Sequence, residues 1–289
     1  MELIIVVAVV LLTLLGTLIN KYLDKSEESL EELLPQEEVI ELDENSLFKK
    51  MTDNFARKVD IEIPIGFNEK EEIETINFNK INNLLIVGTT GGGKTVSLNG
   101  IISSIIMNYS KEDIKILPID TSIVELSTFN HIPHYVQETL VSPKEIEEAL
   151  EKLGVETTKR LKNDKNPFLL VVIDDLYDVL SNDRKNIELL EKLMRDTEKT
   201  NIHFILVTDT PTEEVLNKSL RNYLDGTLYV TLSPGEEKDF SFEQELTKEE
   251  WNYLTEIGNA VYKEKDEKKK IKIPDISEEE LKIIKVAHH

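Results

Sequence analysis

The fold of this chain is constrained most by one eight-residue segment, Gly88-Thr89-Thr90-Gly91-Gly92-Gly93-Lys94-Thr95. The segment matches the pattern G-x-x-x-x-G-K-[ST]. An apolar run, Leu84–Val87, precedes it, and a stretch that favours a helix follows it from Val96 to about Asn108. A strand before the motif and a helix after it are the context that this pattern requires. The segment therefore predicts a phosphate-binding loop.

Each position of this loop has a chemical reason. The glycines let the backbone wrap tightly, so that successive N–H groups point at phosphate oxygens, and the helix start adds its positive dipole end. Lys94 is the predicted catalytic cation, which carries a charge to the β- and γ-phosphates, and the Thr95 hydroxyl is a predicted Mg²⁺ ligand. All eight residues are predicted to bind nucleotide, with ATP and Mg²⁺ as the expected cofactors.

A second acidic site supports this interpretation. The apolar run Phe168–Ile173 ends in Asp174-Asp175, about 80 residues after the loop. In proteins with such a loop, the first acid after this strand holds Mg²⁺ through water, and a following acid polarises the attacking water. Asp174 is thus the predicted metal-side residue and Asp175 the predicted catalytic base. Adjacent residues on a strand point to opposite faces, so the two need not share a role.

Short apolar runs recur along the chain and alternate with helical stretches. Besides those at 84–87 and 168–173, they lie at 114–117, 204–207 and 227–230, with further strands expected at 59–65 and, as a pair, within 258–273. Ser142, Pro143 and Glu145 give one helix a clear start, as N-cap, first position and capping box. Continuous apolar strands between helices predict an α/β fold, in which a mainly parallel central sheet is covered by helices on both faces.

The N-terminal residues predict a membrane anchor. Leu3–Ile19 has no charged residue, and its length is near the lower limit for a transmembrane helix. Lys21 and Lys25 follow it, so the positive-inside rule places the rest of the chain in the cytoplasm. Residues 26–45 hold nine acids and no base. The expected organisation is a transmembrane anchor at 1–22, an acidic linker at 23–54 and one domain at 55–289.

Several segments resemble the FtsK/SpoIIIE-type motor ATPases of the HerA/FtsK group. The loop with its flanks, Asn83–Asn99, is similar to that family's phosphate loop. More specific similarity lies in Ile119-Asp120, Glu125-Leu126-Ser127 and Ile132-Pro133-His134, and Asn201–Thr208 looks like the strand that leads to the family's Thr-Gln-Arg-Pro element. The resemblance extends from about Ile61 to about Val286. It implies a RecA-like fold and a homo-oligomeric ring, expected to be a hexamer with active sites between subunits. It also implies that the ring moves double-stranded DNA during conjugative transfer, DNA segregation or genome packaging.

The sequence departs from the family pattern at catalytic positions. Asp175 stands where the family usually has Glu. Thr208-Asp209-Thr210-Pro211 replaces the family's Thr-Gln-Arg-Pro, so Thr208 and Asp209 occupy the sensor-like positions. The chain has only five arginines, among which Arg195 and Arg221 are the predicted candidates for an arginine finger. Nucleotide binding is therefore better supported by the sequence than rapid hydrolysis.

The composition leaves other functions open. With 56 acidic and 34 basic residues, the formal net charge is -22, which restricts where DNA could touch the protein. The lysine-rich segment Lys263–Lys270 is a possible basic site or a solvated hairpin tip. An FtsK-like ATPase for protein secretion needs no basic lumen and is one alternative. A nucleotide-binding scaffold with weak or no hydrolysis is another, favoured by the altered catalytic positions. The absence of cysteine excludes disulfide scaffolds and cysteine nucleophiles.

Overall fold

The computed structural model describes residues 42–57, 60–122, 125–163, 165–181, 184–209, 211–213, 215–232 and 246–287. Residues 42–289 cluster as one compact unit. Its strands are β1 (Glu62–Asn68), β2 (Ile73–Asn77), β3 (Asn83–Val87), β4 (Ile114–Asp120), β5 (Phe168–Asp174), β6 (Ile202–Thr208), β7 (Gly226–Tyr229), β8 (Asn259–Glu264) and β9 (Glu267–Lys272). Its helices are α2 (Leu47–Asn54), α3 (Lys94–Asn108), the 3₁₀ helix η1 (Leu126–Phe129), α4 (Pro143–Arg160), α5 (Leu176–Ser181), α6 (Arg184–Arg195), α7 (Thr197–Thr200), α8 (Lys218–Arg221), α9 (Lys248–Tyr253) and α10 (Glu278–Ala287).

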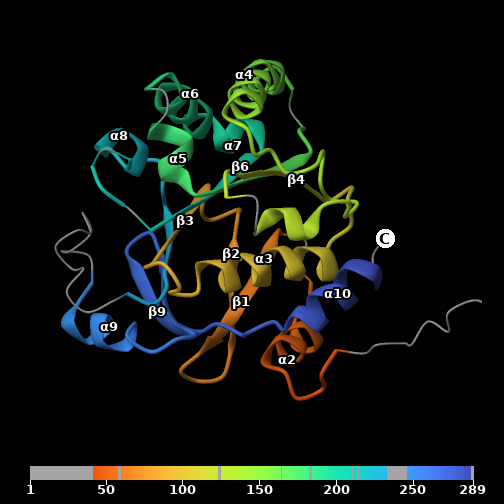
Figure 1. Cartoon of the computed structure of the whole chain (residues 1–289), viewed down its shortest axis with the longest axis vertical. Coiled ribbons are helices and arrows are strands. Elements are labelled where there is room, and N and C mark those ends of the chain that lie inside the picture. Colours follow the sequence, from red (N-terminus) through yellow and green to blue (C-terminus); the bar gives the residue numbers. More distant parts are fainter. Residues whose placement is uncertain are drawn as a thin grey trace, which may run out of the picture. The chain divides into compact units, whose positions relative to one another are not determined.

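The strands of the described residues form one sheet in the order β2-β1-β9-β8-β7-β3-β6-β5-β4 (Figure 1). The half from β7 to β4 is parallel, as expected. The other half is antiparallel, so the prediction of a mainly parallel sheet needs correction to a mixed one. The reason is local, because β8 and β9 are joined by the two-residue turn Lys265-Asp266, and so short a connection joins only antiparallel strands.

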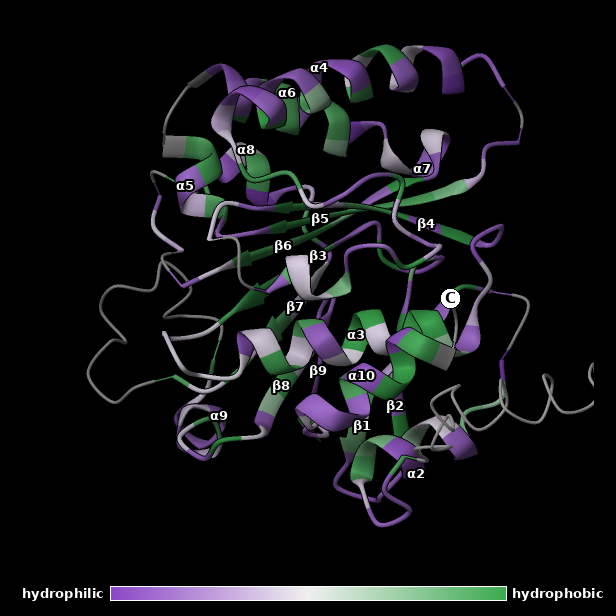
Figure 2. Ribbon diagram, turned by 45° about the vertical axis from the view of Figure 1, so that its right-hand side comes forward, coloured by the Kyte–Doolittle hydropathy of each residue, from purple (hydrophilic) through white to green (hydrophobic). Residues whose placement is uncertain are grey.

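Helices cover both faces of the sheet, and alternation along β3 shows how. Leu84 and Ile86 belong to a core shared with α2, α3 and α10. Leu85 and Val87 belong to a second core shared with α4, α5, α6 and α8. Figure 2 shows the central strands β3, β5 and β6 largely in the green of hydrophobic residues, between helices that also carry purple, hydrophilic positions. This is the expected three-layer α/β arrangement.

The five apolar runs predicted as strands of the parallel half all form strands, and β1 begins within the predicted segment 59–65. Helix α4 has the predicted N-cap, since the Ser142 hydroxyl accepts a hydrogen bond from the Glu145 N–H, and Pro143 is its first residue. The Glu145 carboxylate accepts from the Ser142 hydroxyl, rather than from the backbone N–H that the predicted capping box would use. β2 had no predicted counterpart. α2 lies inside the segment expected to be linker, yet its Phe48 and Met51 are buried. The compact unit therefore begins upstream of residue 55.

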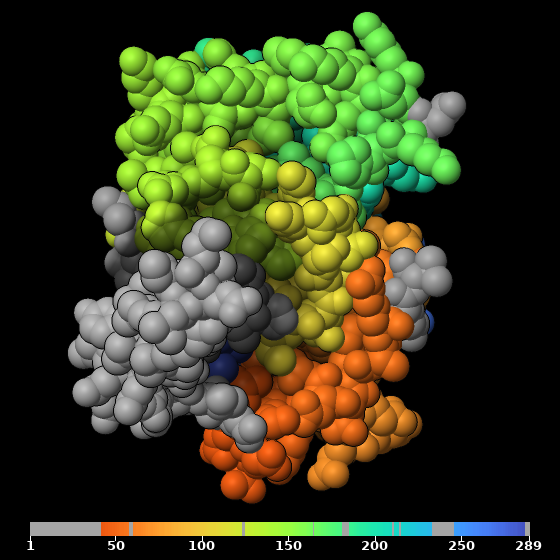
Figure 3. All heavy atoms as spheres, turned by 90° about the vertical axis from the view of Figure 1, so that its right-hand side faces the viewer, coloured from red at the N-terminus to blue at the C-terminus, as the bar shows by residue number. Residues whose placement is uncertain are grey.

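Figure 3 shows one face of the unit, with the orange atoms of α2 and nearby residues at one end and the green atoms of α4 at the other. The predicted anchor at 1–22, and the acidic linker up to residue 41, lie outside the described residues. Among the residues that are described, no helix combines the length and the apolar character that crossing a bilayer requires.

Candidate nucleotide-binding site

The parallel strands bring their carboxyl ends to one edge, where the candidate site lies. The register sets Val87 of β3 opposite Thr208 of β6, and Asp120 of β4 opposite Asp174 of β5. Crevices at this edge are the usual ligand sites of open α/β sheets. The strand ends therefore place the predicted phosphate loop, Asp174 and Thr208 along the same edge.

The loop leads from β3 directly into α3, as the motif requires. Gly91 has φ = 74° and Gly93, the N-cap of α3, has φ = 95°. These left-handed conformations suit glycine, which has no Cβ to clash. The first N–H groups of α3 have no partner within the helix and carry its positive dipole end. The loop thus presents backbone donors at the place where phosphates would bind.

The chain after β7 holds the loop in place, a feature that the sequence did not predict. The carbonyl oxygen of Thr231 accepts hydrogen bonds from the N–H and the hydroxyl of Thr89, each at 3.1 Å. The N–H of Thr231 donates to the Gly92 carbonyl at 3.0 Å. A Cβ on Gly92 would lie 2.4 Å from the Thr231 oxygen, and one on Gly88 would lie 2.2 Å from Val230 Cγ2. These two glycines are thus required by close approach, since neither has a positive φ.

Lys94 lies folded over the loop. Its ammonium donates to the carbonyl oxygens of Gly88 and Thr89, at 3.1 and 3.0 Å. Burial lowers the pKa of Lys94, and four nearby acids oppose that shift: Asp209, Asp174, Asp175 and Glu125, in decreasing order. The predicted catalytic lysine therefore faces the acids at the ends of β5 and β6.

Asp174 and Asp175 stand side by side at the end of β5. Burial, together with the charge of Asp120, raises the pKa of Asp174 to about 7. Asp175 has left the strand and has φ = 59°, and its N–H donates to Asp174 Oδ1 at 3.0 Å. Burial raises the pKa of Asp175 as well, and the charge of Lys94 acts against this rise. A left-handed non-glycine residue is strained, and such residues cluster at functional sites.

The position of Asp175 changes one sequence argument. Opposite faces were expected for the two acids because neighbouring strand residues alternate. Since Asp175 is no longer in the strand, alternation does not apply, and both acids act electrostatically on Lys94. At the end of β6, Thr208 is buried, and Asp209 Oδ2 accepts a hydrogen bond from the Thr90 hydroxyl at 2.9 Å. The sensor-like Asp209 is therefore part of the loop's surroundings, whereas Thr210 lies outside the described residues.

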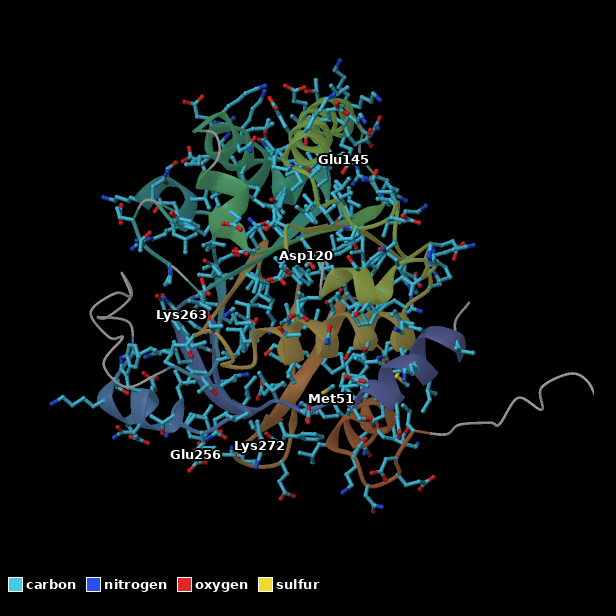
Figure 4. All side chains as sticks on the ribbon, viewed as in Figure 1. Met51, Asp120, Glu145, Glu256, Lys263 and Lys272 are labelled. Atoms are coloured by element: carbon cyan, nitrogen blue, oxygen red, sulfur yellow. The ribbon has the colours of Figure 1, made fainter. Side chains whose placement is uncertain are left out.

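Two further acids, to which the sequence assigned no role, complete the surroundings. Asp120, at the end of β4, is buried inside the unit (Figure 4). Its carboxylate accepts hydrogen bonds from the N–H groups of Ser122, Glu125 and Leu126 and from the Ser122 hydroxyl. Glu125 Oε1 in turn accepts from the Thr95 hydroxyl at 2.9 Å. For Asp120, the available signal was an acid soon after the strand predicted at 114–117, at the same sheet edge as Asp174.

The residues of the site fit a magnesium nucleotide better than a bare metal ion. Among the described residues, no group of three or more acidic or histidine side chains is arranged to hold a metal. The Thr95 hydroxyl oxygen and the nearby Asp174 carboxylate are hard oxygen donors of the kind that Mg²⁺ takes. Mg²⁺ is usually bound by one or two such groups, with substrate phosphates completing its shell. Thr95 and Asp174 would thus hold the ion together with a nucleotide at the loop.

Most of the basic residues that the sequence singled out have partners in the structure. Arg221 donates to the Leu216 carbonyl and pairs with Glu213 at 2.8 Å. On β9, Lys268, Lys269 and Lys270 pair with Glu250, Glu74 and Glu249, respectively. Arg195, the other candidate finger, is exposed at the end of α6. The hairpin lysines are therefore largely neutralised by acids, in keeping with a hairpin on the surface.

Comparison with known proteins identifies a family domain in part of the chain. The family model of FtsK/SpoIIIE matches residues 47–163, which include the phosphate loop, Asp120 and Glu125. These residues form an FtsK/SpoIIIE family domain. The resemblance noted in the sequence is thus confirmed. The match ends before Asp174, so the second half of the site is placed by the fold alone.

Curated relatives of this chain are bacterial DNA translocases named FtsK. That of Staphylococcus epidermidis is 26% identical over 216 residues, which are 65% of this chain and 27% of the relative. That of Streptococcus pneumoniae is 27% identical over 203 residues, 61% of this chain and 26% of the relative. The chain thus spans about a quarter of the length of the curated relatives that it matches.

Solved structures show the same fold. The cytoplasmic domain of the Thermomonospora curvata type VII secretion ATPase EccC superposes with a TM-score of 0.65 at 15% identity, over 83% of this chain and 32% of that one. The conjugation coupling protein TcpA of pCW3 gives a TM-score of 0.63 at 17% identity, over 81% of this chain and 73% of that one. The RecA-like ATPase fold expected from the sequence is therefore supported.

Proposed function

We propose that this chain is an ATP-binding motor of the FtsK/SpoIIIE type, which couples ATP hydrolysis to the movement of double-stranded DNA. The observation that carries the proposal is the phosphate loop of an FtsK/SpoIIIE domain with Lys94 facing Asp174, Asp175 and Asp209. A half-buried cation beside several acids, at the end of parallel strands, is the arrangement that phosphoryl chemistry needs.

The proposed division of roles follows from the geometry. The N–H groups of the loop and of the start of α3 bind the phosphates, and Lys94 exchanges its two carbonyl partners for phosphate oxygens. Mg²⁺ supplies charge neutralisation at the phosphates. Asp175 is proposed to orient and deprotonate the attacking water, since its raised pKa suits it to accept a proton.

The assembly of this motor is also part of the proposal. A homo-oligomeric ring, expected to be a hexamer, would place an arginine of one subunit at the site of its neighbour. Arg195 suits this role because it is exposed, whereas Arg221 is held by Glu213. A segment at Leu3–Ile19 would anchor the ring in the membrane, with the motor domain in the cytoplasm.

Double-stranded DNA is the proposed substrate because the curated relatives carry the name DNA translocase. The net charge of -22 and the paired lysines of β9 limit the surface that could contact DNA phosphates. We therefore propose that DNA contacts are confined to a small part of the ring lumen. The same acidity favours protein secretion as the alternative substrate class, in line with the structural similarity to a type VII secretion ATPase.

The ATPase rate of the purified full chain in detergent, with and without duplex DNA, tests the proposal. We expect stimulation by duplex DNA and its loss in Lys94→Ala. Stimulation by a secreted protein but not by DNA would select the secretion alternative. If the chain binds ATP but hydrolyses none under any of these conditions, it is a nucleotide-binding scaffold. The altered residues Asp175 and Asp209 favour that alternative.

Asp175→Asn gives the matched test of the proposed base. This substitution preserves the size of the side chain and its hydrogen-bonding shape, but removes its ability to take a proton. We expect turnover to fall by about 100-fold or more, while ATP affinity changes little. Equal turnover in the variant and the wild type would show that Asp175 is not the base.

A further inference from the structure

The 3₁₀-helix loop after β4 carries an acid whose contact with the phosphate loop has no assigned role. Thr95 Oγ1 donates to Glu125 Oε1 at 2.9 Å, although the two residues are 30 positions apart in the chain. Thr95 is the residue through which the loop is expected to hold Mg²⁺. An acid bound to this hydroxyl is therefore placed to control how its oxygen is presented.

The loop that carries Glu125 is built around a buried carboxylate. Asp120 is fully buried, and it accepts hydrogen bonds from the N–H groups of Glu125 and Leu126 at 3.0 and 3.1 Å. Its other oxygen accepts the N–H and the hydroxyl of Ser122, at 2.9 and 2.6 Å. Leu126, the next residue, is buried in the core that includes α3. The backbone of Glu125 is thus fixed relative to the helix that begins at Lys94.

The hydrogen bond has a direction that matters chemically. A threonine hydroxyl has one proton to donate and two lone pairs. In this structure the proton is donated to Glu125, so both lone pairs of the oxygen remain for a cation.

We propose that Glu125 is a positioning residue for the Mg²⁺ ligand Thr95. It fixes the direction of the Thr95 hydroxyl and adds a negative charge just outside the inner shell of the ion. This inference rests on the proposed function, because it requires that a magnesium nucleotide binds at the loop. Within that function, Glu125 is the residue on which the Mg²⁺-dependent part of the nucleotide affinity depends.

The experiment is the binding of the fluorescent nucleotide mant-ADP to the full chain, measured once with Mg²⁺ and once with EDTA. Partners that orient a metal ligand typically contribute 10- to 100-fold to metal affinity. We therefore expect Glu125→Ala to reduce the gain in affinity caused by Mg²⁺ by about 10-fold or more, with no change in EDTA. Glu125→Gln, which keeps an acceptor oxygen but loses the charge, should reduce the gain less. Glu188→Ala, which removes an exposed acid on α6, is the control and should leave the gain unchanged.

A Thr95→Val background separates positioning from general damage. If Glu125 acts through the Thr95 hydroxyl, Glu125→Ala should add no further loss of the Mg²⁺ gain in that background. Two results would overturn the inference while leaving the proposed function intact. One is that Mg²⁺ increases the mant-ADP affinity of Glu125→Ala as much as that of the wild type; the other is that Glu125→Ala loses affinity equally in Mg²⁺ and in EDTA. A wild-type chain that binds no nucleotide in either condition would overturn both.

Discussion

The contact between the phosphate loop and the chain after β7 makes a sharp prediction about Gly88. A Cβ at this position would lie 2.2 Å from Val230 Cγ2, well inside the shortest contact that such atoms show, and 3.2 Å from the Thr231 carbonyl oxygen. Val230 is only 1% exposed, so its side chain has little space in which to move. Overpacking of this kind typically costs about 1 to 3 kcal/mol. We expect Gly88→Ala to lower the free energy of unfolding by about 2 kcal/mol and to weaken nucleotide binding.

The size of the clash can be tested by removing its partner. Val230→Ala alone should cost about 2 kcal/mol, because it deletes two buried methyl groups. In the double variant the new methyl group of residue 88 occupies part of that space, so the costs should fall short of their sum by at least about 1 kcal/mol. Urea unfolding followed by circular dichroism measures all three variants. If the loss of unfolding free energy in the double variant equals the sum of the two single losses within about 0.5 kcal/mol, the contact between residues 88 and 230 is refuted.

Gly92 provides the contrasting case. Its Cβ would lie 2.4 Å from the Thr231 carbonyl oxygen, which is backbone. Truncating a side chain cannot relieve this clash. Gly92→Ala should therefore lose the hydrogen bonds around Thr231, at about 1 kcal/mol each, and also lose nucleotide binding. A Gly92→Ala variant that keeps its nucleotide affinity within about twofold would show that the contact between Thr231 and the phosphate loop is not needed for binding.

Three other predictions concern the acids, the arginines and the lysines. Burial raises the pKa of Asp174 from 3.8 to about 7, so the nucleotide-free protein in EDTA should become less stable as the pH rises between these two values. Urea unfolding at several pH values measures this loss, and Asp174→Asn should make it smaller. At pH 8 the variant should have a free energy of unfolding higher than that of the wild type by up to about 4 kcal/mol. Arg160 is buried and donates to the carbonyls of Pro167 and Thr200 at 2.6 and 3.0 Å. Arg160→Ala should therefore lower the free energy of unfolding by about 2 to 4 kcal/mol in the same assay. A decrease of less than about 1 kcal/mol would contradict its structural role. Lys269 lies 2.7 Å from Glu74, so Lys269→Ala should change DNA stimulation of the ATPase by less than about twofold; a tenfold loss would make the hairpin a DNA contact.

Local sequence signals predicted the parts of the site that depend on neighbouring residues. The phosphate loop is a single continuous motif, and its flanking strand and helix formed as β3 and α3. Asp174 was predicted in the same way, because it directly follows the apolar run Phe168–Ile173. The common edge of β3, β5 and β6 then follows from parallel pairing. These predictions needed no knowledge of distant contacts.

The features that were missed depend on contacts between distant residues. Thr231 supports the loop through backbone atoms, which no side-chain pattern reveals, and it is 142 positions from Thr89. Glu125 reaches Thr95 only because the loop folds around Asp120. In the antiparallel half, strands were expected at 59–65 and as a pair within 258–273, but the pairing of the first strand with this pair was not, and β2 was not expected at all; partly polar strands such as β9 lack the continuous apolar character of β5. Helix α2 fell within the predicted linker because the domain was expected to begin at residue 55, although its two buried side chains are apolar.

ATP-driven movement along DNA is the central claim, and displacement of a triplex-forming oligonucleotide from duplex DNA tests it most directly. The full chain, assembled at a concentration that allows rings to form, should release the third strand in the presence of ATP and Mg²⁺. Lys94→Ala should release none, and Glu188→Ala should match the wild type. Release of the third strand at equal rates with and without ATP, or no release by a chain that hydrolyses ATP rapidly, would contradict the proposal that this chain moves double-stranded DNA.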